Sequence, residues 1–158
     1  MEDSFAEGLI KGRIAETIFS LMFEEAKEFD VLPLGYEQTT PILAQYQHLA
    51  HVKKVLDNIR HAPDFALISH DHKSVYFVEV KYRWELDNQE IEKIAKDLNY
   101  KFEPCLLFVA TPIQFYFDSC SDIIKLHGVK TPMRETWASK ISQDRYLKLL
   151  NKFISPKV

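Results

Sequence analysis

The sequence lacks any hydrophobic run near the roughly 20 residues that a membrane-spanning helix needs. Its first residues, Met1, Glu2 and Asp3, are acidic overall, unlike the basic start of a secretory signal. Cysteine is scarce: Cys105 and Cys120 are the only two, and their separation matches no metal-ligand spacing. From these absences we expect a cytoplasmic protein with no membrane association and no disulfide.

A strong positive charge is also lacking. The 158 residues carry 20 Lys and Arg against 23 Asp and Glu, for a net charge of −3. This balance argues against a broad basic surface, because nonspecific affinity for nucleic acid comes from neutralising phosphates, but it leaves room for a local basic groove. The 46% of hydrophobic residues is ordinary for a globular protein. We therefore predict that residues 1–158 form a single domain.

Two short apolar runs, 65–68 and 75–78, flank a polar break and predict a β-hairpin. If the hairpin is symmetric about the middle of that break, Asp64 lies directly opposite Glu79. Cross-strand partners have Cβ atoms roughly 5 Å apart, and like charges at that distance destabilise a sheet unless a positive charge lies between them. Lys81, on the same face as Glu79, supplies one positive charge, and a bound cation would supply the rest.

Carboxylate oxygens at this spacing suit Mg²⁺, or Mn²⁺ in its place, because Mg²⁺ takes one or two protein carboxylates and keeps several waters. The alternative is a plain ion network of Asp64, Glu79 and Lys81 on a solvated sheet face. The hairpin strands are apolar on both faces, however, which is typical of buried strands. We therefore expect the charges at their ends to line a cleft.

The remaining elements follow from the spacing of apolar residues. Helices are predicted over residues 4–29, 41–58, 87–100 and 142–154, with a short helical turn over 121–126. Strands are predicted over residues 30–38, 105–110 and 113–117. The run 105–110 is almost entirely apolar, as expected for a central strand covered on both faces. In the last helix we expect Ser142 to be the N-cap and Ile141 and Phe153 to face inward.

The order of these elements resembles the PD-(D/E)XK nuclease superfamily. Pro63 and Asp64 begin one hairpin strand, and Glu79, Val80 and Lys81 end the other. The resemblance covers roughly residues 4–110 and implies an α/β restriction-endonuclease-like fold, a three-layer α/β/α core with a central mixed sheet. A C-terminal helical extension over about 119–155 lies outside it.

Within the superfamily the sequence looks most like the archaeal Holliday-junction resolvase type, in which a glycine and a glutamate four residues later lie in the first helix. Here these are Gly12 and Glu16. Gly8 and Gly12 are poor helix formers, so we also expect another element to approach the helix backbone closely there.

The resemblance implies that Asp64 and Glu79 bind Mg²⁺, with the Val80 carbonyl as a further ligand. Glu16 would join through a water or complete a second site, and Lys81 would orient and help deprotonate the attacking water. The implied activity is that of a metal-dependent endonuclease acting on nucleic acid, with DNA expected. Cleaving both strands of a duplex calls for two active sites, so a homodimer is expected by analogy.

Arg83 and Trp84 stand just past this group, where a guanidinium and an indole could meet phosphate and base, although Trp84 could equally cap the core. The full set of residues expected to contact nucleic acid is Arg13, Arg83, Trp84, Gln89, Lys93 and Lys96. The alternative function is a nuclease-like module that binds nucleic acid or protein without cleavage, which the acidic charge favours. A subunit of a repair or defence assembly is a third reading, which exposed aromatics in residues 129–137 would support.

Overall fold

The structure is a computed structural model that describes residues 2–34, 49 and 61–154. The helix predicted over 41–58 lies outside these residues, apart from Leu49, and so does the end of the strand predicted over 30–38.

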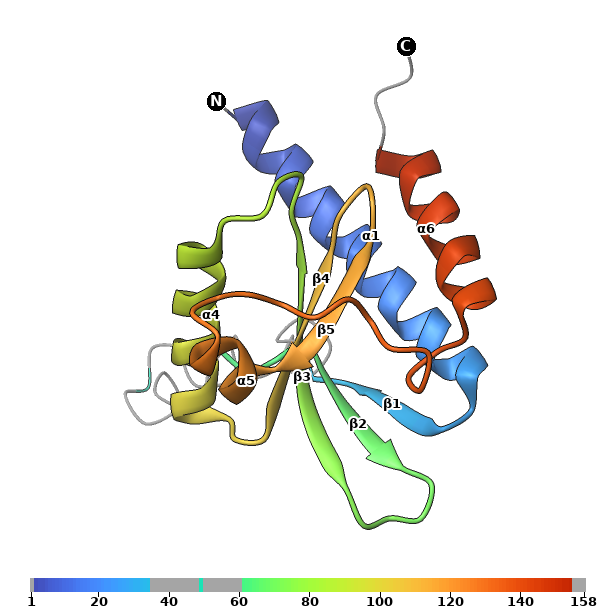
Figure 1. Ribbon diagram of the computed structural model, residues 1–158. Coiled ribbons are helices and arrows are strands. Elements are labelled where there is room, and N and C mark those ends of the chain that lie inside the picture. The colour runs from blue at the N-terminus through green and yellow to red at the C-terminus, as the bar shows by residue number, and fades with distance from the viewer. Residues whose placement is uncertain (1, 35–48, 50–60, 155–158) are drawn as a thin grey trace.

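Five strands form one mixed sheet in the order β1-β2-β3-β4-β5 (Figure 1). They are β1 Phe29–Pro33, β2 Phe65–Ser69, β3 Val75–Tyr82, β4 Cys105–Ala110 and β5 Phe115–Ser119. The strands β3 and β4 run parallel, whereas the other neighbouring pairs are antiparallel. The prediction of an α/β protein with a mixed sheet is thus confirmed.

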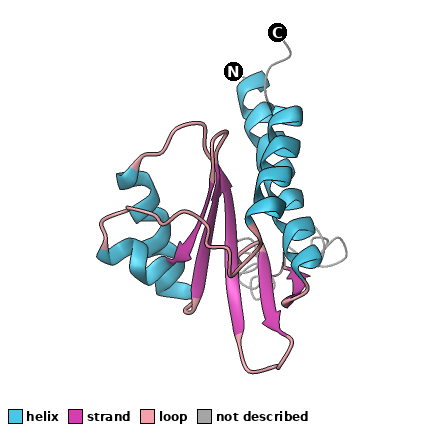
Figure 2. Ribbon diagram, turned by 45° about the vertical axis from the view of Figure 1, so that its right-hand side comes forward, coloured by secondary structure: helices cyan, strands magenta, loops and turns pink. Residues whose placement is uncertain are grey.

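Helices cover both faces of the sheet (Figures 1 and 2). On one face lie α1 (Glu2–Ala26) and α6 (Lys140–Ile154), and on the other lie α4 (Asn88–Lys101) and α5 (Cys120–Lys125). All six residues of β4 are buried, because alternate side chains enter the two apolar clusters on opposite faces. None of the helices in the described part of the chain is long and apolar enough to cross a membrane.

Phe19 holds α1 against the sheet. Its ring is buried, and the ring centroids of Phe65 on β2 and Phe108 on β4 each lie 5.1 Å from it. A fully buried aromatic side chain of this kind stabilises the folded state by roughly 1.5–3 kcal/mol. Because Phe19 lies one helical turn after Glu16, this packing also fixes where Glu16 stands.

The register of the β2–β3 hairpin is the one that the sequence predicts. Phe65 pairs with Val78 and Leu67 with Tyr76, so each pair of residue numbers sums to 143. The turn closes where the Ser69 hydroxyl and the Lys73 backbone N–H both donate to the Asp71 carboxylate. The apolar residues of both strands therefore keep the faces that the alternation assigns to them.

The C-terminal helix differs from the prediction in its phase. Ser139, not Ser142, caps it: the Ser139 hydroxyl accepts a hydrogen bond from the Ser142 backbone N–H at 3.2 Å. Ile141 and Phe153 are 83% and 63% exposed, so the expectation that they face inward was wrong. The buried residues of α6 are instead Gln143, Leu150 and Ile154, because Leu150 and Ile154 pack into the apolar cluster under α1.

The strand predicted over 113–117 lies two residues later, as β5. A tight turn occupies the start of the predicted segment: the Thr111 hydroxyl accepts from the backbone N–H of Gln114, and the Gln114 carbonyl accepts from the Thr111 N–H. Residues inside such a turn cannot pair with β4, so the strand begins after it.

The surroundings of the glycines also differ from the prediction. A Cβ at Gly8 or Gly12 would meet nothing within 4 Å, so none of the described elements approaches α1 there. The close approach is at Gly128, which follows α5. Gly128 has a φ of +85°, and a Cβ on it would lie 1.8 Å from the Asn88 carbonyl oxygen at the start of α4.

We expect Gly128→Ala to lower the free energy of unfolding by at least about 2 kcal/mol, because alanine would be strained at this φ and would collide with Asn88. Gly8→Ala is the matched control and should raise stability by roughly 0.5–1 kcal/mol, since Gly8 has open space in a helix. Urea denaturation of both variants measures the difference. Equal stability of Gly128→Ala and the wild type would contradict the close packing of α4 and α5.

Candidate functional site

Asp64 stands one residue before β2, beside the end of β3. Its carboxylate oxygen Oδ2 accepts a hydrogen bond from the Val80 backbone N–H at 2.8 Å. The Asp64 carbonyl in turn accepts from the Leu34 backbone N–H at 2.9 Å. Asp64, which precedes the hairpin, is thereby hydrogen-bonded both to Leu34, just after β1, and to Val80, between Glu79 and Lys81.

Glu79 and Lys81 lie on one face of β3, as the strand alternation requires. Lys81 Nζ donates a hydrogen bond to Glu79 Oε1 at 2.5 Å, and the Glu79 side chain is only 14% exposed. Val80 points to the other face, where it is buried in the cluster under α1. A charge-assisted hydrogen bond of this kind fixes the lysine beside the carboxylate.

The carboxylates of Asp64 and Glu79 interact strongly. Burial raises the pKa of Asp64, and this is opposed by the hydrogen bond from Val80 N–H and by the charge of Lys81. Burial also raises the pKa of Glu79, the negative charge of Asp64 raises it further, and Lys81 opposes both. Lys81 therefore offsets only part of the cost of keeping two negative charges in this half-buried place.

Glu16 joins the site from α1. Burial raises the pKa of its carboxyl group, and the negative charge of Asp64 is the next largest cause, while Arg13 and Lys81 lower it. Arg13 Nη1 donates to Glu16 Oε2 at 3.0 Å. The structure thus brings together all four residues predicted to be catalytic, from a helix and from both arms of a hairpin.

Three oxygen donors of this group could hold a hard cation: the carboxylates of Asp64 and Glu79 and the carbonyl of Val80. Among the described residues, no group of three or more His, Cys, Asp or Glu side chains is arranged to bind a metal ion. Mg²⁺ does not need such a cage, because it usually binds one or two carboxylates and retains several waters. The donor chemistry fits Mg²⁺ or Mn²⁺ and does not fit a metal that prefers nitrogen or sulfur.

Arg83 is held by the protein itself. Its Nε lies 2.9 and 3.0 Å from the two carboxylate oxygens of Glu90 on α4, its Nη2 also bonds Glu90, and its Nη1 donates to the Tyr82 carbonyl at 2.8 Å. Glu90 was not among the residues that sequence reasoning selected. An acidic residue in the first turn of a helix is common, so its position alone gives no signal.

The other residues predicted to contact nucleic acid are accessible. Trp84 is 60% exposed, so it does not cap the core, which was the alternative prediction. Gln89, Lys93 and Lys96 lie along one exposed stripe of α4, although Lys96 is paired with Glu92 at 2.8 Å. Arg13 lies beside the carboxylates through its bond to Glu16. Arg13 and Arg83 therefore border the site, whereas Lys93 and Lys96 lie further along α4.

No protein-family model matches the sequence, and a comparison with curated proteins finds no match either.

Asp64 gives a test of the electrostatics that needs no ligand. The folded-state pKa of Asp64 is raised, so its ionisation disfavours the folded state, and the contribution of Asp64 to stability falls as the pH rises above about 4. Asp64→Asn cannot ionise but can still accept from Val80. In metal-free buffer at pH 7.5 it should be more stable by on the order of 1 kcal/mol, or roughly 2–4 °C in Tm, and the gain should vanish near pH 4.

Asp71, at the other end of the same hairpin, is the matched control. The hydrogen bond from the Ser69 hydroxyl lowers its pKa, and the one from the Lys73 backbone N–H lowers it further, so its ionised form stabilises the folded state above about pH 4. Asp71→Asn should therefore lower Tm at pH 7.5, and the loss should shrink as the pH falls. A lower Tm for both variants at pH 7.5 would contradict the assigned strain at Asp64.

Proposed function

We propose that this chain is a metal-dependent phosphodiesterase that hydrolyses nucleic acid, with DNA as the expected substrate. The observation that carries the proposal is the convergence of Glu16, Asp64, Glu79 and Lys81 on one half-buried place, where burial and mutual repulsion raise the pKa of the carboxyl groups. Perturbed groups of this kind cluster at functional sites. The mixed sheet with helices on both faces supports the restriction-endonuclease-like fold that this function implies.

In this proposal Asp64, Glu79 and the Val80 carbonyl hold Mg²⁺ or Mn²⁺. When bound, the ion would polarise a phosphoryl oxygen and lower the pKa of a coordinated water. It would also neutralise the repulsion between Asp64 and Glu79 that Lys81 offsets only in part.

Lys81 is the residue that faces the reacting groups. An ammonium has three N–H donors, and one of them goes to Glu79. The others can orient the attacking water and a phosphoryl oxygen of the substrate. Glu16, steadied by Arg13, is placed to hold a further water at the edge of the site. Cleavage of both strands of a duplex would need two such sites, so the proposal includes a homodimer.

Substrate contact in this proposal begins at Arg83 and Trp84. The exposed indole of Trp84 offers a stacking surface for a base. The guanidinium group of Arg83 can form two parallel hydrogen bonds to a phosphate as well as to a carboxylate. A substrate phosphate would therefore compete with Glu90 for this group. Along α4, Gln89, Lys93 and Lys96 would extend the contact.

The second candidate is a module that binds nucleic acid or protein without cleaving it. The ion pairs of Arg83 with Glu90 and of Lys96 with Glu92 favour a module that binds protein, because they neutralise two of the basic residues that contact with nucleic acid would use. The assembly-subunit reading loses its predicted support. Trp137, the aromatic residue of segment 129–137, is partly buried and packs against Phe29 and Phe117 at 5.5 and 4.8 Å.

Titration of Mn²⁺ followed by calorimetry tests the metal site. We expect binding to the wild type, none to Asp64→Ala, and unchanged binding to Asp97→Ala, which removes an exposed carboxylate of α4. Lys81→Ala should still bind Mn²⁺ but cleave DNA roughly 10²-fold more slowly or worse. Equal Mn²⁺ binding by Asp64→Ala would refute the site, whereas metal binding without cleavage of duplex, branched or single-stranded substrates would favour the second candidate.

The Arg83–Glu90 pair gives a test of substrate binding. Glu90→Gln should release Arg83 and tighten DNA binding several-fold, with a steeper salt dependence, while Arg83→Ala should weaken binding and reduce the salt slope by about 1. Lys101→Ala, at the far end of α4, is the control and should change neither. Anisotropy titrations at several salt concentrations measure both quantities. An unchanged slope in Arg83→Ala would mean that this residue does not meet phosphate.

A further inference from the structure

A groove runs between α1 and α6 on the side of these helices that faces away from the sheet. The two helices lie side by side and run in opposite directions (Figures 1 and 2). Two adjoining cavities of about 610 and 590 Å³ share Leu21 and Leu149 and so form one continuous groove. Residues between Leu9 and Glu25 of α1 and between Arg145 and Phe153 of α6 line it. We call it the α1–α6 groove.

The floor of the α1–α6 groove is apolar and open to solvent. α1 already buries one apolar stripe, which includes Ile18 and Phe19, against the sheet. Leu9, Ile10 and Leu21 form a second apolar surface that remains exposed, and Phe153 of α6 adds to it. Single exposed apolar side chains are ordinary, but a contiguous apolar surface in a concave site is typical of a place where another molecule binds.

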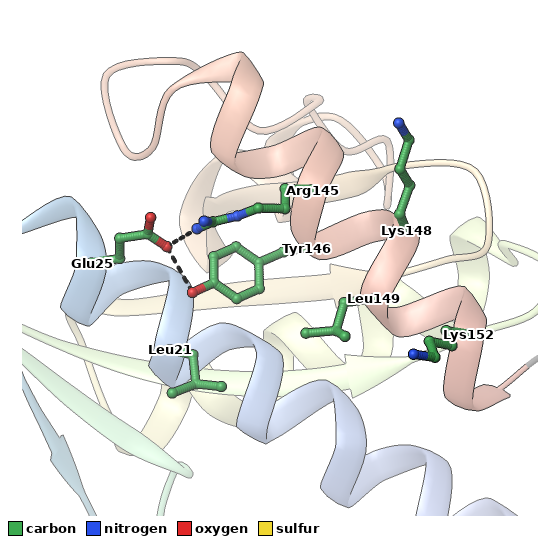
Figure 3. Close-up of a pocket in the computed structure, with 7 residues that line it drawn as sticks. All are labelled: Leu21, Glu25, Arg145, Tyr146, Lys148, Leu149 and Lys152. Carbon is green, nitrogen blue, oxygen red and sulfur yellow. Dashed lines mark hydrogen bonds and ion pairs between the residues drawn. The ribbon is translucent and has the colours of Figure 1, made fainter.

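The rim of the α1–α6 groove is basic, although the chain as a whole carries a net charge of −3. Arg13, Arg145, Lys148 and Lys152 line the two cavities against a single acidic residue, Glu25. Glu25 is already engaged, because Arg145 and the Tyr146 hydroxyl both donate to its Oε2 (Figure 3).

Among the basic residues that line the groove, Lys148 and Lys152 have no counter-charge in the described part of the chain. They lie four residues apart on α6, where like charges destabilise a helix slightly. Neither forms an ion pair with another described residue. Their charges therefore make no ion pair that stabilises the described fold. Both residues line the end of the groove nearest Glu25, where the Lys152 ammonium points toward Leu149 and the Lys148 ammonium points away from it (Figure 3).

We infer that the α1–α6 groove is a docking site for an acidic amphipathic helix of a partner protein. From Leu9 to Glu25 the groove spans about 24 Å at 1.5 Å per residue, the length of a helix of four to five turns. Such a helix would place apolar side chains at i, i+4 and i+7 on the floor and its acidic side chains against Lys148 and Lys152. A concave floor favours a helix over a lipid bilayer, which presents a flat surface.

The groove and the proposed nuclease site share one residue, Arg13, which lines the groove and donates a hydrogen bond to Glu16. The groove lies on the α1 and α6 side of the sheet, whereas α4, with Gln89 and Lys93, lies on the other (Figure 1). A partner helix could therefore occupy the groove while the α4 face remains accessible. Binding in the groove requires neither a metal nor nucleic acid. The outcome of a peptide-binding test therefore does not depend on whether the chain binds a metal or cleaves DNA.

The test uses a labelled synthetic peptide of about 18 residues, with leucine at i, i+4, i+7 and i+11 and glutamate on the opposite face. Two control peptides carry the same composition in scrambled order, or lysine in place of glutamate. Fluorescence anisotropy measures the affinity of each for the full chain. We expect the acidic amphipathic peptide to bind about tenfold more tightly than either control, or better.

Variants locate the binding. Ile10→Asp, which puts a charge on the groove floor at a residue that is 58% exposed, should weaken binding by about tenfold or more. Ile113→Asp is the matched control: the side chain is 82% exposed in the turn before β5, and binding should not change. Combined Lys148→Glu and Lys152→Glu should reverse the preference, so that the lysine peptide binds better than the glutamate peptide.

Three results would overturn the inference. The first is that the scrambled peptide binds as tightly as the acidic amphipathic peptide, or that Ile10→Asp leaves the affinity for the acidic amphipathic peptide unchanged. The second is association with phosphatidylserine vesicles that Ile10→Asp abolishes, which would assign the surface to a membrane. The third is concentration-dependent self-association in sedimentation that Ile10→Asp abolishes, which would assign the groove to a second copy of the chain.

Discussion

The hydrogen bond from the Val80 backbone N–H to the Asp64 carboxylate is the constraint on which the site depends. It fixes Asp64 beside the end of β3, and the hairpin register fixes Glu79 and Lys81 on the face next to it. A slip of one residue would turn Glu79 and Lys81 into the apolar cluster under α1 and bring Val80 out. The alternating apolar residues of β2 and β3 exclude that slip, because both faces of the hairpin pack against buried neighbours.

The site destabilises the ionised forms of its own carboxyl groups, and the packing of the core around it offsets that loss of stability. Burial and mutual repulsion disfavour the ionised forms of Asp64, Glu79 and Glu16. The packing of Phe19 against Phe65 and Phe108 holds α1, and with it Glu16, against the hairpin despite this repulsion. Such an arrangement costs stability, and this cost is the ground on which we propose a bound cation and a reaction there rather than a structural ion network.

Sequence reasoning succeeded where one local rule decides the structure. The symmetry of the polar break set the hairpin register, and the uninterrupted apolar run of β4 identified a strand covered on both faces. It failed where tertiary contacts decide. Ile141 and Phe153 are apolar yet exposed, because the packing of Leu150 and Ile154 into the cluster under α1 sets which stripe of α6 faces the sheet. The pairing of Arg83 with Glu90 depends on how α4 packs beside the end of β3, and no spacing in the sequence encodes that contact.

The central claim is that a divalent cation binds at the end of the hairpin, and NMR spectroscopy with Mn²⁺ tests it most directly. Mn²⁺ is paramagnetic and broadens the amide signals of residues near it, so the wild-type protein reports the site without any substitution. The account predicts that substoichiometric Mn²⁺ broadens the signals of Glu16, Asp64, Glu79, Val80 and Lys81 first. Broadening centred on exposed acidic residues such as Asp97 or Asp122, with the hairpin signals unaffected, would contradict it.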